Sequence, residues 1–152
     1  MRILLLEDDP KQAEGITLSI TDRFDAEVVR IATESEFRLA IRKEFALSAD
    51  LAVLDVMVRW TDPSLNMPRR PEDVCAEGPP RAGLRCLALL REVAPEMPVI
   101  AYTILEEDDL SEDLISSPAG KARGTGPSVL LRKDGDRTPL IEGIEHLLSA
   151  ND

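Results

Sequence analysis

The sequence has few of the side chains that build metal centres, disulfide frameworks and aromatic binding surfaces. It contains two cysteines, Cys75 and Cys86, and one histidine, His146, and aromatic residues make up only 3% of the chain. Two cysteines and one histidine at wide spacing do not form a zinc site. We expect both cysteines to be free thiols, which is their usual state in a reducing compartment.

Long hydrophobic runs and an excess of positive charge are also missing. No apolar run approaches the roughly 18 residues that a membrane span requires. The short apolar stretch at the N-terminus leads directly into acidic residues, which is not the pattern of a signal peptide. Lysine and arginine total 18 against 29 aspartate and glutamate residues, and the net charge is −11. Such a chain offers no basic face for nucleic acid. We therefore expect a cytoplasmic protein with no membrane partner and no direct nucleic-acid partner.

The chain does have the apolar content of a folded domain. Its 152 residues are 43% hydrophobic, which is enough for one domain over residues 1–152. Five short runs are rich in apolar residues, and several of them are apolar without alternation, as in parallel strands that are covered on both faces. These runs are RILLL at 2–6, AEVVRI at 26–31, LAVL at 51–54, PVIAYT at 98–103 and SVLLR at 128–132.

Helical patterns separate the five runs. Asp9 and Pro10 are typical of an N-cap and a first helical turn, and Thr33 with Glu36 forms a capping-box pattern. We predict helices from Pro10 to about Ile20 and from Thr33 to about Ala46, helices over 83–93 and 106–116, and a last helix that ends at about Ala150. The order β-α, repeated five times, predicts a doubly wound α/β domain.

Two stretches interrupt this order and are predicted to be loops. Residues 58–82, which we call the insert, contain five prolines and several arginines, and residues 116–128 are rich in glycine, proline and serine. The insert is longer than the usual connection in a compact domain, which favours a functional role or disorder. Trp60 either packs the insert onto the domain or forms a lid or partner contact with Arg69, Arg70 and Arg81.

Polar residues stand at the ends of the predicted strands. Glu7 and Asp8 end the first strand, Asp55 the third, Thr103 the fourth and Lys133 the fifth. In an open α/β sheet these ends meet at one edge. Clustered carboxylates repel one another, and Mg²⁺ would offset that repulsion through the oxygen ligands it prefers. With a lysine to pair with phosphoryl oxygens, such a site suits phosphoryl transfer to a carboxylate.

These segments resemble the receiver domain of bacterial two-component response regulators. RILLLEDDP is similar to the family's first strand with its acidic pair, and LAVLDVM to the strand with the phosphoacceptor. GLRCLALLREVAPEMPVIAYT is similar to the next helix and the strand with the switch hydroxyl, and VLLRKD to the last strand with its lysine. The resemblance covers nearly the whole chain outside the two predicted loops. It implies a flavodoxin-like five-stranded parallel sheet in the order 2-1-3-4-5.

The resemblance also implies a role for each site residue. Asp55 would accept the phosphoryl group, Thr103 would bind that group and move with it, and Lys133 would pair with it. Arg132 is the alternative to Lys133. Mg²⁺ would be bound by Asp8, Asp55 and the backbone carbonyl of Met57, with Glu7 acting through water.

We expect the protein to be a stand-alone signalling domain of this kind. By the resemblance, a histidine kinase or a phosphotransfer protein would supply the phosphoryl group. The domain would then signal through contacts with a downstream protein or pass the group on, and it could form a homodimer. The domain would phosphorylate and dephosphorylate itself without being an enzyme in the usual sense. We expect no output domain after the last helix.

The sequence departs from the family in three places. Gly83 follows Asp55 by 28 positions, a longer interval than the family has. Lys133 is followed by Asp134 where the family has proline, which leaves the shape of that turn open. Residues 129–131 are aliphatic where the family often has an aromatic switch residue, and Tyr102 points to the opposite face from Thr103.

Two other functions fit parts of this pattern. One is a pseudo-receiver that keeps the acids and binds partners without switching. The other is a small Mg²⁺-dependent phosphatase, which would need a second aspartate where Met57 stands. A nucleotide-binding module is a weaker alternative, because no G-x-G-x-x-G motif follows the first strand.

Overall fold

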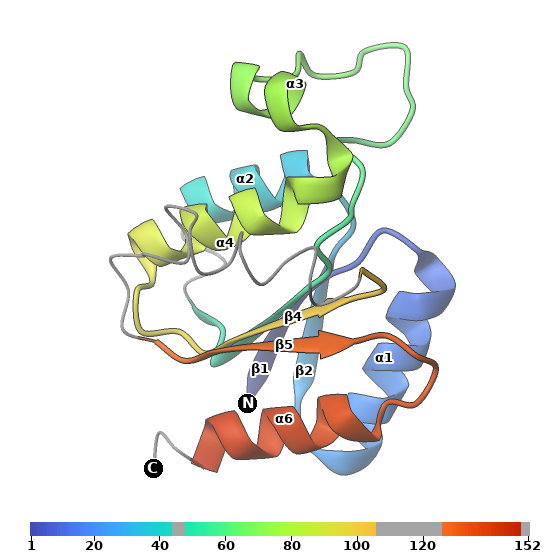
Figure 1. The fold of residues 1–152 in the computed structure, drawn as a ribbon, viewed down its shortest axis with the longest axis vertical. Helices are drawn as coiled ribbons and strands as arrows, with labels where there is room; N and C mark the ends of the chain where they lie inside the picture. Colours follow the sequence, from blue (N-terminus) through green and yellow to red (C-terminus); the bar gives the residue numbers. More distant parts are fainter. Residues whose placement is uncertain (44–47, 106–125, 150–152) are drawn as a thin grey trace.

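A five-stranded parallel sheet forms the centre of the molecule (Figure 1). The structure is a computed structural model that describes residues 1–43, 48–105 and 126–149. The sheet order is β2-β1-β3-β4-β5, which confirms the predicted topology. The strands are β1 (Arg2–Leu6), β2 (Glu27–Ile31), β3 (Leu51–Leu54), β4 (Val99–Thr103) and β5 (Ser128–Arg132). Each lies within one residue of its predicted run.

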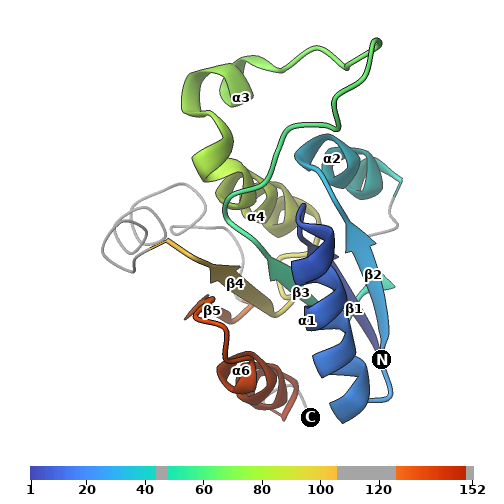
Figure 2. The same cartoon turned by 90° about the vertical axis from the view of Figure 1, so that its right-hand side faces the viewer.

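Helices cover both faces of the sheet (Figures 1 and 2). One apolar cluster joins the sheet to α2 and α4, and a second joins it to α1 and α6. The helices are α1 (Pro10–Arg23), α2 (Glu34–Arg42), α3 (Glu72–Glu77), α4 (Ala82–Val93) and α6 (Thr138–Ser149), with a short 3₁₀ helix, η2 (Pro79–Arg81). None of the helices in the described ranges is both long and apolar enough to span a membrane.

The predicted caps set the starts of α1 and α2. The Asp9 carboxylate accepts hydrogen bonds from the N–H groups of Lys11 and Gln12 at 2.8 and 3.1 Å. These bonds lower the pKa of Asp9. Thr33 caps α2 by accepting from the N–H of Glu36 at 3.3 Å, while the Glu36 carboxylate accepts from the N–H of Ala32 at 3.0 Å. Both caps satisfy N–H groups that a helix start leaves without a partner.

The prediction that the insert is a loop throughout was wrong. Residues 72–77 form α3 and residues 79–81 form η2, and α3 lies beyond α2 and α4 (Figure 1). The prolines of this stretch precede or follow α3 and do not interrupt it. The helix predicted at 106–116 and most of the loop predicted at 116–128 lie outside the described residues.

Candidate functional site

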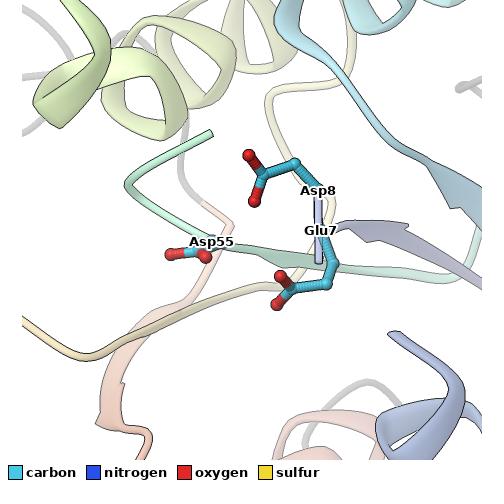
Figure 3. Close-up of side chains that lie close together, drawn as sticks. All are labelled: Glu7, Asp8 and Asp55. Carbon is cyan, nitrogen blue, oxygen red and sulfur yellow. The ribbon is translucent and has the colours of Figure 1, made fainter. Parts of the chain in front are cut away.

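Three carboxylates lie together at the carboxyl edge of the sheet (Figure 3). Glu7 and Asp8 follow β1, and Asp55 follows β3. The parallel pairing of β1 with β3 continues into a hydrogen bond from the Asp55 N–H to the Leu6 carbonyl at 2.9 Å, which fixes Asp55 next to the end of β1. One oxygen from each carboxylate lies within 4.8 Å of the others. This oxygen donor set fits a hard cation such as Mg²⁺.

Lys133 compensates two of these three charges. Its Nζ donates to Asp55 Oδ2 at 2.8 Å and also to Glu7 Oε2. Lys133 reaches the acids because its N–H donates to the Thr103 carbonyl at 2.7 Å, which extends the pairing of β5 with β4 by one residue. Arg132, the alternative to Lys133, is paired in register with Thr103 and is exposed.

Burial and neighbouring charges shift the pKa values of Glu7 and Lys133. Burial raises the pKa of the Glu7 carboxyl, an effect that outweighs its hydrogen bond and attraction to Lys133. Burial lowers the pKa of Lys133, but its ion pairs with Asp55 and Glu7 outweigh that effect, and the pKa is raised. The Lys133 side chain is therefore protonated at neutral pH.

The main chain around Asp55 is tightly packed. The second carboxylate oxygen, Oδ1, accepts a hydrogen bond from the N–H of Met57 at 3.1 Å. Gly83, at the start of α4, donates its N–H to the Val56 carbonyl at 2.8 Å. A Cβ atom on Gly83 would lie 2.1 Å from the Asp55 carbonyl oxygen. Gly83 thus lets α4 begin directly against the segment that carries Asp55.

Thr103 lies at the end of β4 but makes no described contact with the carboxylates. It is fully buried, and its hydroxyl accepts the N–H of Leu105 at 3.3 Å. Tyr102 packs on the opposite face, in the cluster with α1 and α6, as predicted. The Lys133 Nζ lies over the Tyr102 ring, 5.6 Å from the ring centroid. An aromatic side chain therefore lies against the site lysine from β4, while residues 129–131 of β5 are aliphatic.

The turn after Lys133 is built without proline. The Asp134 carboxylate accepts the N–H of Asp136 at 3.1 Å, and Gly135 takes a left-handed backbone conformation with φ of 96°. Asp136 in turn accepts the N–H of Thr138 at 2.9 Å, at the start of α6. Side-chain turn motifs and a glycine thus carry the chain from Lys133 to the last helix.

Arg59, which the sequence did not single out, contacts the third carboxylate. Its backbone N–H and its Nε both donate to Asp8 Oδ2, at 3.2 and 3.3 Å, and its Nη2 donates to the Asp8 carbonyl at 3.0 Å. The sequence suggested Arg69, Arg70 and Arg81 for a lid or partner contact. Arg59, near the start of the insert, is the residue whose described contacts reach Asp8.

Trp60 packs the insert onto the domain, the first of its two predicted roles. Its side chain is buried, its indole N–H donates to the Pro68 carbonyl at 3.1 Å, and the Arg38 guanidinium lies 5.6 Å from the ring centroid. Arg69 and Arg70 are exposed and border an open hollow of about 610 Å³.

A buried charge cluster that the sequence did not reveal holds α2, α3 and α4 together. The Glu34 carboxylate is fully buried and accepts bonds from Arg85 at 2.9 and 2.6 Å and from Arg38 at 2.8 Å. Arg38 also pairs with Asp73, and Arg85 with Glu77 at 3.3 Å. The only sequence signal was the position of Glu34 in the first turn of α2.

Comparison with known proteins identifies the fold. No family model and no curated protein matches the sequence. Solved structures do match. A response regulator receiver protein from Sinorhizobium medicae is 18% identical with a TM-score of 0.67, covering 100% of this chain and 97% of that one. The chain has the fold of a response regulator receiver domain.

Other receivers show the same similarity to this chain. A CheY-like receiver domain protein from Methanospirillum hungatei is 21% identical with a TM-score of 0.66, covering 98% of this chain and 94% of that one. The BeF3-activated N-terminal receiver domain of RstA from Klebsiella pneumoniae is 20% identical with a TM-score of 0.65, covering 97% and 98%. The matches therefore cover nearly the whole of this chain.

Proposed function

We propose that the protein is a response regulator receiver that accepts a phosphoryl group on Asp55. The observation that carries this proposal is the bridge from Lys133 to both Asp55 and Glu7, beside Asp8, at the carboxyl edge of a receiver-like sheet. Receiver-like architecture alone would not carry it, because one fold supports many functions. The acidic cluster with its lysine is what phosphoryl transfer requires.

The carboxylates fit Mg²⁺ in distinct ways. Asp8 and Asp55 would bind it, with the Met57 carbonyl as a further ligand. Glu7 would act through water, since its Oε1 accepts the Asp9 N–H at 3.1 Å and its Oε2 pairs with Lys133. The bound cation would neutralise charge on the phosphoryl oxygens.

The chain's own residues would carry the transfer itself. An Asp55 carboxylate oxygen attacks the phosphorus of the donor, a new O–P bond forms, and the bond to the donor's leaving group breaks with its electron pair leaving on that group. Lys133 would exchange its bond to Asp55 for one to a phosphoryl oxygen. Thr103 would give up its contact with the Leu105 N–H to reach the same group, which would move the end of β4.

The donor and target follow from the same proposal. A histidine kinase or a phosphotransfer protein would supply the phosphoryl group in the cytoplasm, and a downstream protein or a second copy would bind the phosphorylated form. Turnover of an external substrate is not part of the proposed function, which comprises self-phosphorylation and self-dephosphorylation.

Mass spectrometry after incubation with acetyl phosphate and Mg²⁺ tests this function. We expect the wild type to gain one phosphoryl group, and we expect no gain in Asp55→Asn or in the presence of EDTA. Asp22→Asn, which alters an exposed aspartate of α1, is the matched control and should behave like the wild type. Phosphorylation of Asp55→Asn at the wild-type level would refute the assignment.

A pseudo-receiver is the second candidate, and one observation favours it. Arg59 and Lys133 already compensate the acidic cluster, so the site is neutralised in part without a metal. If the wild type gains no phosphoryl group although Mg²⁺ binds, this second function replaces the first.

A further inference from the structure

We propose that Arg59 is a counter-ion for Asp8 that opposes divalent-cation binding and couples occupancy of the acidic site to the insert. The inference rests on the proposed function, because it concerns the same carboxylates. It assigns a role to a residue outside the motifs that suggested the receiver family. Arg59 would set how tightly the site binds its metal.

The contact between Arg59 and Asp8 is made by three donors. The backbone N–H and Nε share Asp8 Oδ2 at 3.2 and 3.3 Å, and Nη2 reaches the Asp8 carbonyl at 3.0 Å. Both the carboxylate and the main chain of Asp8 are therefore engaged. The fourth donor, Nη1, pairs with Asp62 at 3.2 Å, within the insert.

The main chain holds Arg59 in this position. The Glu34 N–H, at the start of α2, donates to the Arg59 carbonyl at 3.1 Å, and the Ser35 N–H donates to the Trp60 carbonyl at 2.9 Å. These are N–H groups of a first helical turn, which have no partner within their own helix. The helix start therefore binds the first residues of the insert and places Arg59 beside Asp8.

The charges of the site predict competition between Arg59 and a metal. Lys133 compensates Glu7 and Asp55, and Arg59 compensates Asp8. A divalent cation bound to Asp8 would bring two positive charges close to the guanidinium, and the two would repel. The Arg59 and Asp8 side chains are 42% and 25% exposed, so solvent screens part of this repulsion.

Competition of this kind is reciprocal. If Arg59 weakens cation binding, the bound cation weakens the hold of Arg59 on Asp8 by the same factor. Trp60 is the next residue and the only tryptophan. Its fluorescence is therefore a direct report on this end of the insert as the metal binds.

Isothermal titration with Mg²⁺ tests the proposal on wild type, Arg59→Gln and Arg69→Gln. Arg69 is exposed on the same insert, so Arg69→Gln makes the same change in net charge away from the described contacts of Asp8. We expect Arg59→Gln to bind Mg²⁺ about three- to tenfold more tightly than wild type, and we expect Arg69→Gln to match the wild type. The Trp60 emission change on Mg²⁺ binding should be smaller in Arg59→Gln.

The outcomes separate this inference from the proposed function. If wild type binds Mg²⁺ and Arg59→Gln binds with equal or weaker affinity, the inference fails and the proposed function stands. If Mg²⁺ binds to Arg59→Gln alone, the inference is supported in its strongest form. If no variant binds Mg²⁺, both fail. Asp8→Asn should abolish binding, and circular dichroism in EDTA confirms that each variant is folded.

Discussion

At the scale of single residues, the close approach of α4 to Asp55 depends on Gly83. In the interior of most helices, replacing glycine with alanine raises the free energy of unfolding by about 0.5–1 kcal/mol. At Gly83 the added Cβ would lie 2.1 Å from the Asp55 carbonyl oxygen and 2.6 Å from the Val56 Cα. Both are main-chain atoms, so the segment that carries the proposed phosphoacceptor must shift.

We therefore expect Gly83→Ala to lower the free energy of unfolding by about 1–3 kcal/mol, as overpacking does elsewhere, and to slow phosphorylation. Urea unfolding and the rate of mass gain measure the two effects. Gly143→Ala in α6 is the control, because its Cβ would meet the end of the Leu131 side chain at 3.0 Å, and it should be close to neutral. Equal effects of the two changes would contradict the role of Gly83.

Single residues also show what the sequence can predict about the site. The sequence predicts that Glu7, Asp55 and Lys133 lie together. Each follows an apolar run, and the carboxyl ends of parallel strands meet at one edge of the sheet. The sequence did not predict the contact of Arg59 with Asp8 or the ion pair between Glu34 and Arg85. Their contacts depend on how the insert and helices far apart in sequence pack together, and no local pattern encodes that packing.

At the scale of elements, the Glu34 cluster is a polar contact that joins α2, α3 and α4. Glu34 is fully buried and pairs with Arg85, whose side chain is only 7% exposed. The bonds to Glu34 raise the pKa of Arg85, so the guanidinium stays charged. Removing one member of such a buried pair leaves a charge without compensation in a low-dielectric environment.

We expect Glu34→Gln to lower the free energy of unfolding by about 3 kcal/mol, at the low end for a buried ion pair because Asp73 and Glu77 still contact the two arginines. Chemical denaturation measures this loss. Glu27→Gln, which breaks an exposed pair with Arg2, should cost less than about 1 kcal/mol. A similar small loss for Glu34→Gln would show that the cluster does not stabilise the fold.

Elements differ in how well the sequence predicts them. The strands were predicted to within one residue, because each contains a short run of apolar residues, which is longest in the buried central strands. The short helix α3 was missed, because its six residues lie among prolines and carry only one buried side chain, Val74. Such a helix is formed by its contacts with α2 and α4 and not by an apolar stripe of its own.

At the scale of the whole molecule, metal binding and global stability are linked. A ligand that binds only the folded state raises the free energy of unfolding, by about 2.7 kcal/mol when it is present at 100 times its dissociation constant. The proposed ligands Asp8 and Asp55 follow β1 and β3, which are neighbours in the sheet. They meet only when the sheet is formed, so the unfolded chain lacks the site.

We therefore expect saturating Mg²⁺ to raise the melting temperature by about 5–10 °C for a chain of this size, measured by calorimetry at constant ionic strength. Asp8→Asn should lose this increase, because it lacks one of the ligands. Arg59→Gln should reach the full increase at a lower Mg²⁺ concentration than wild type, since its site would no longer hold the competing guanidinium. A shift of equal size in Asp8→Asn would mean that Mg²⁺ stabilises this acidic protein by general screening of its net charge of −11 and not through the carboxylates at the edge of the sheet.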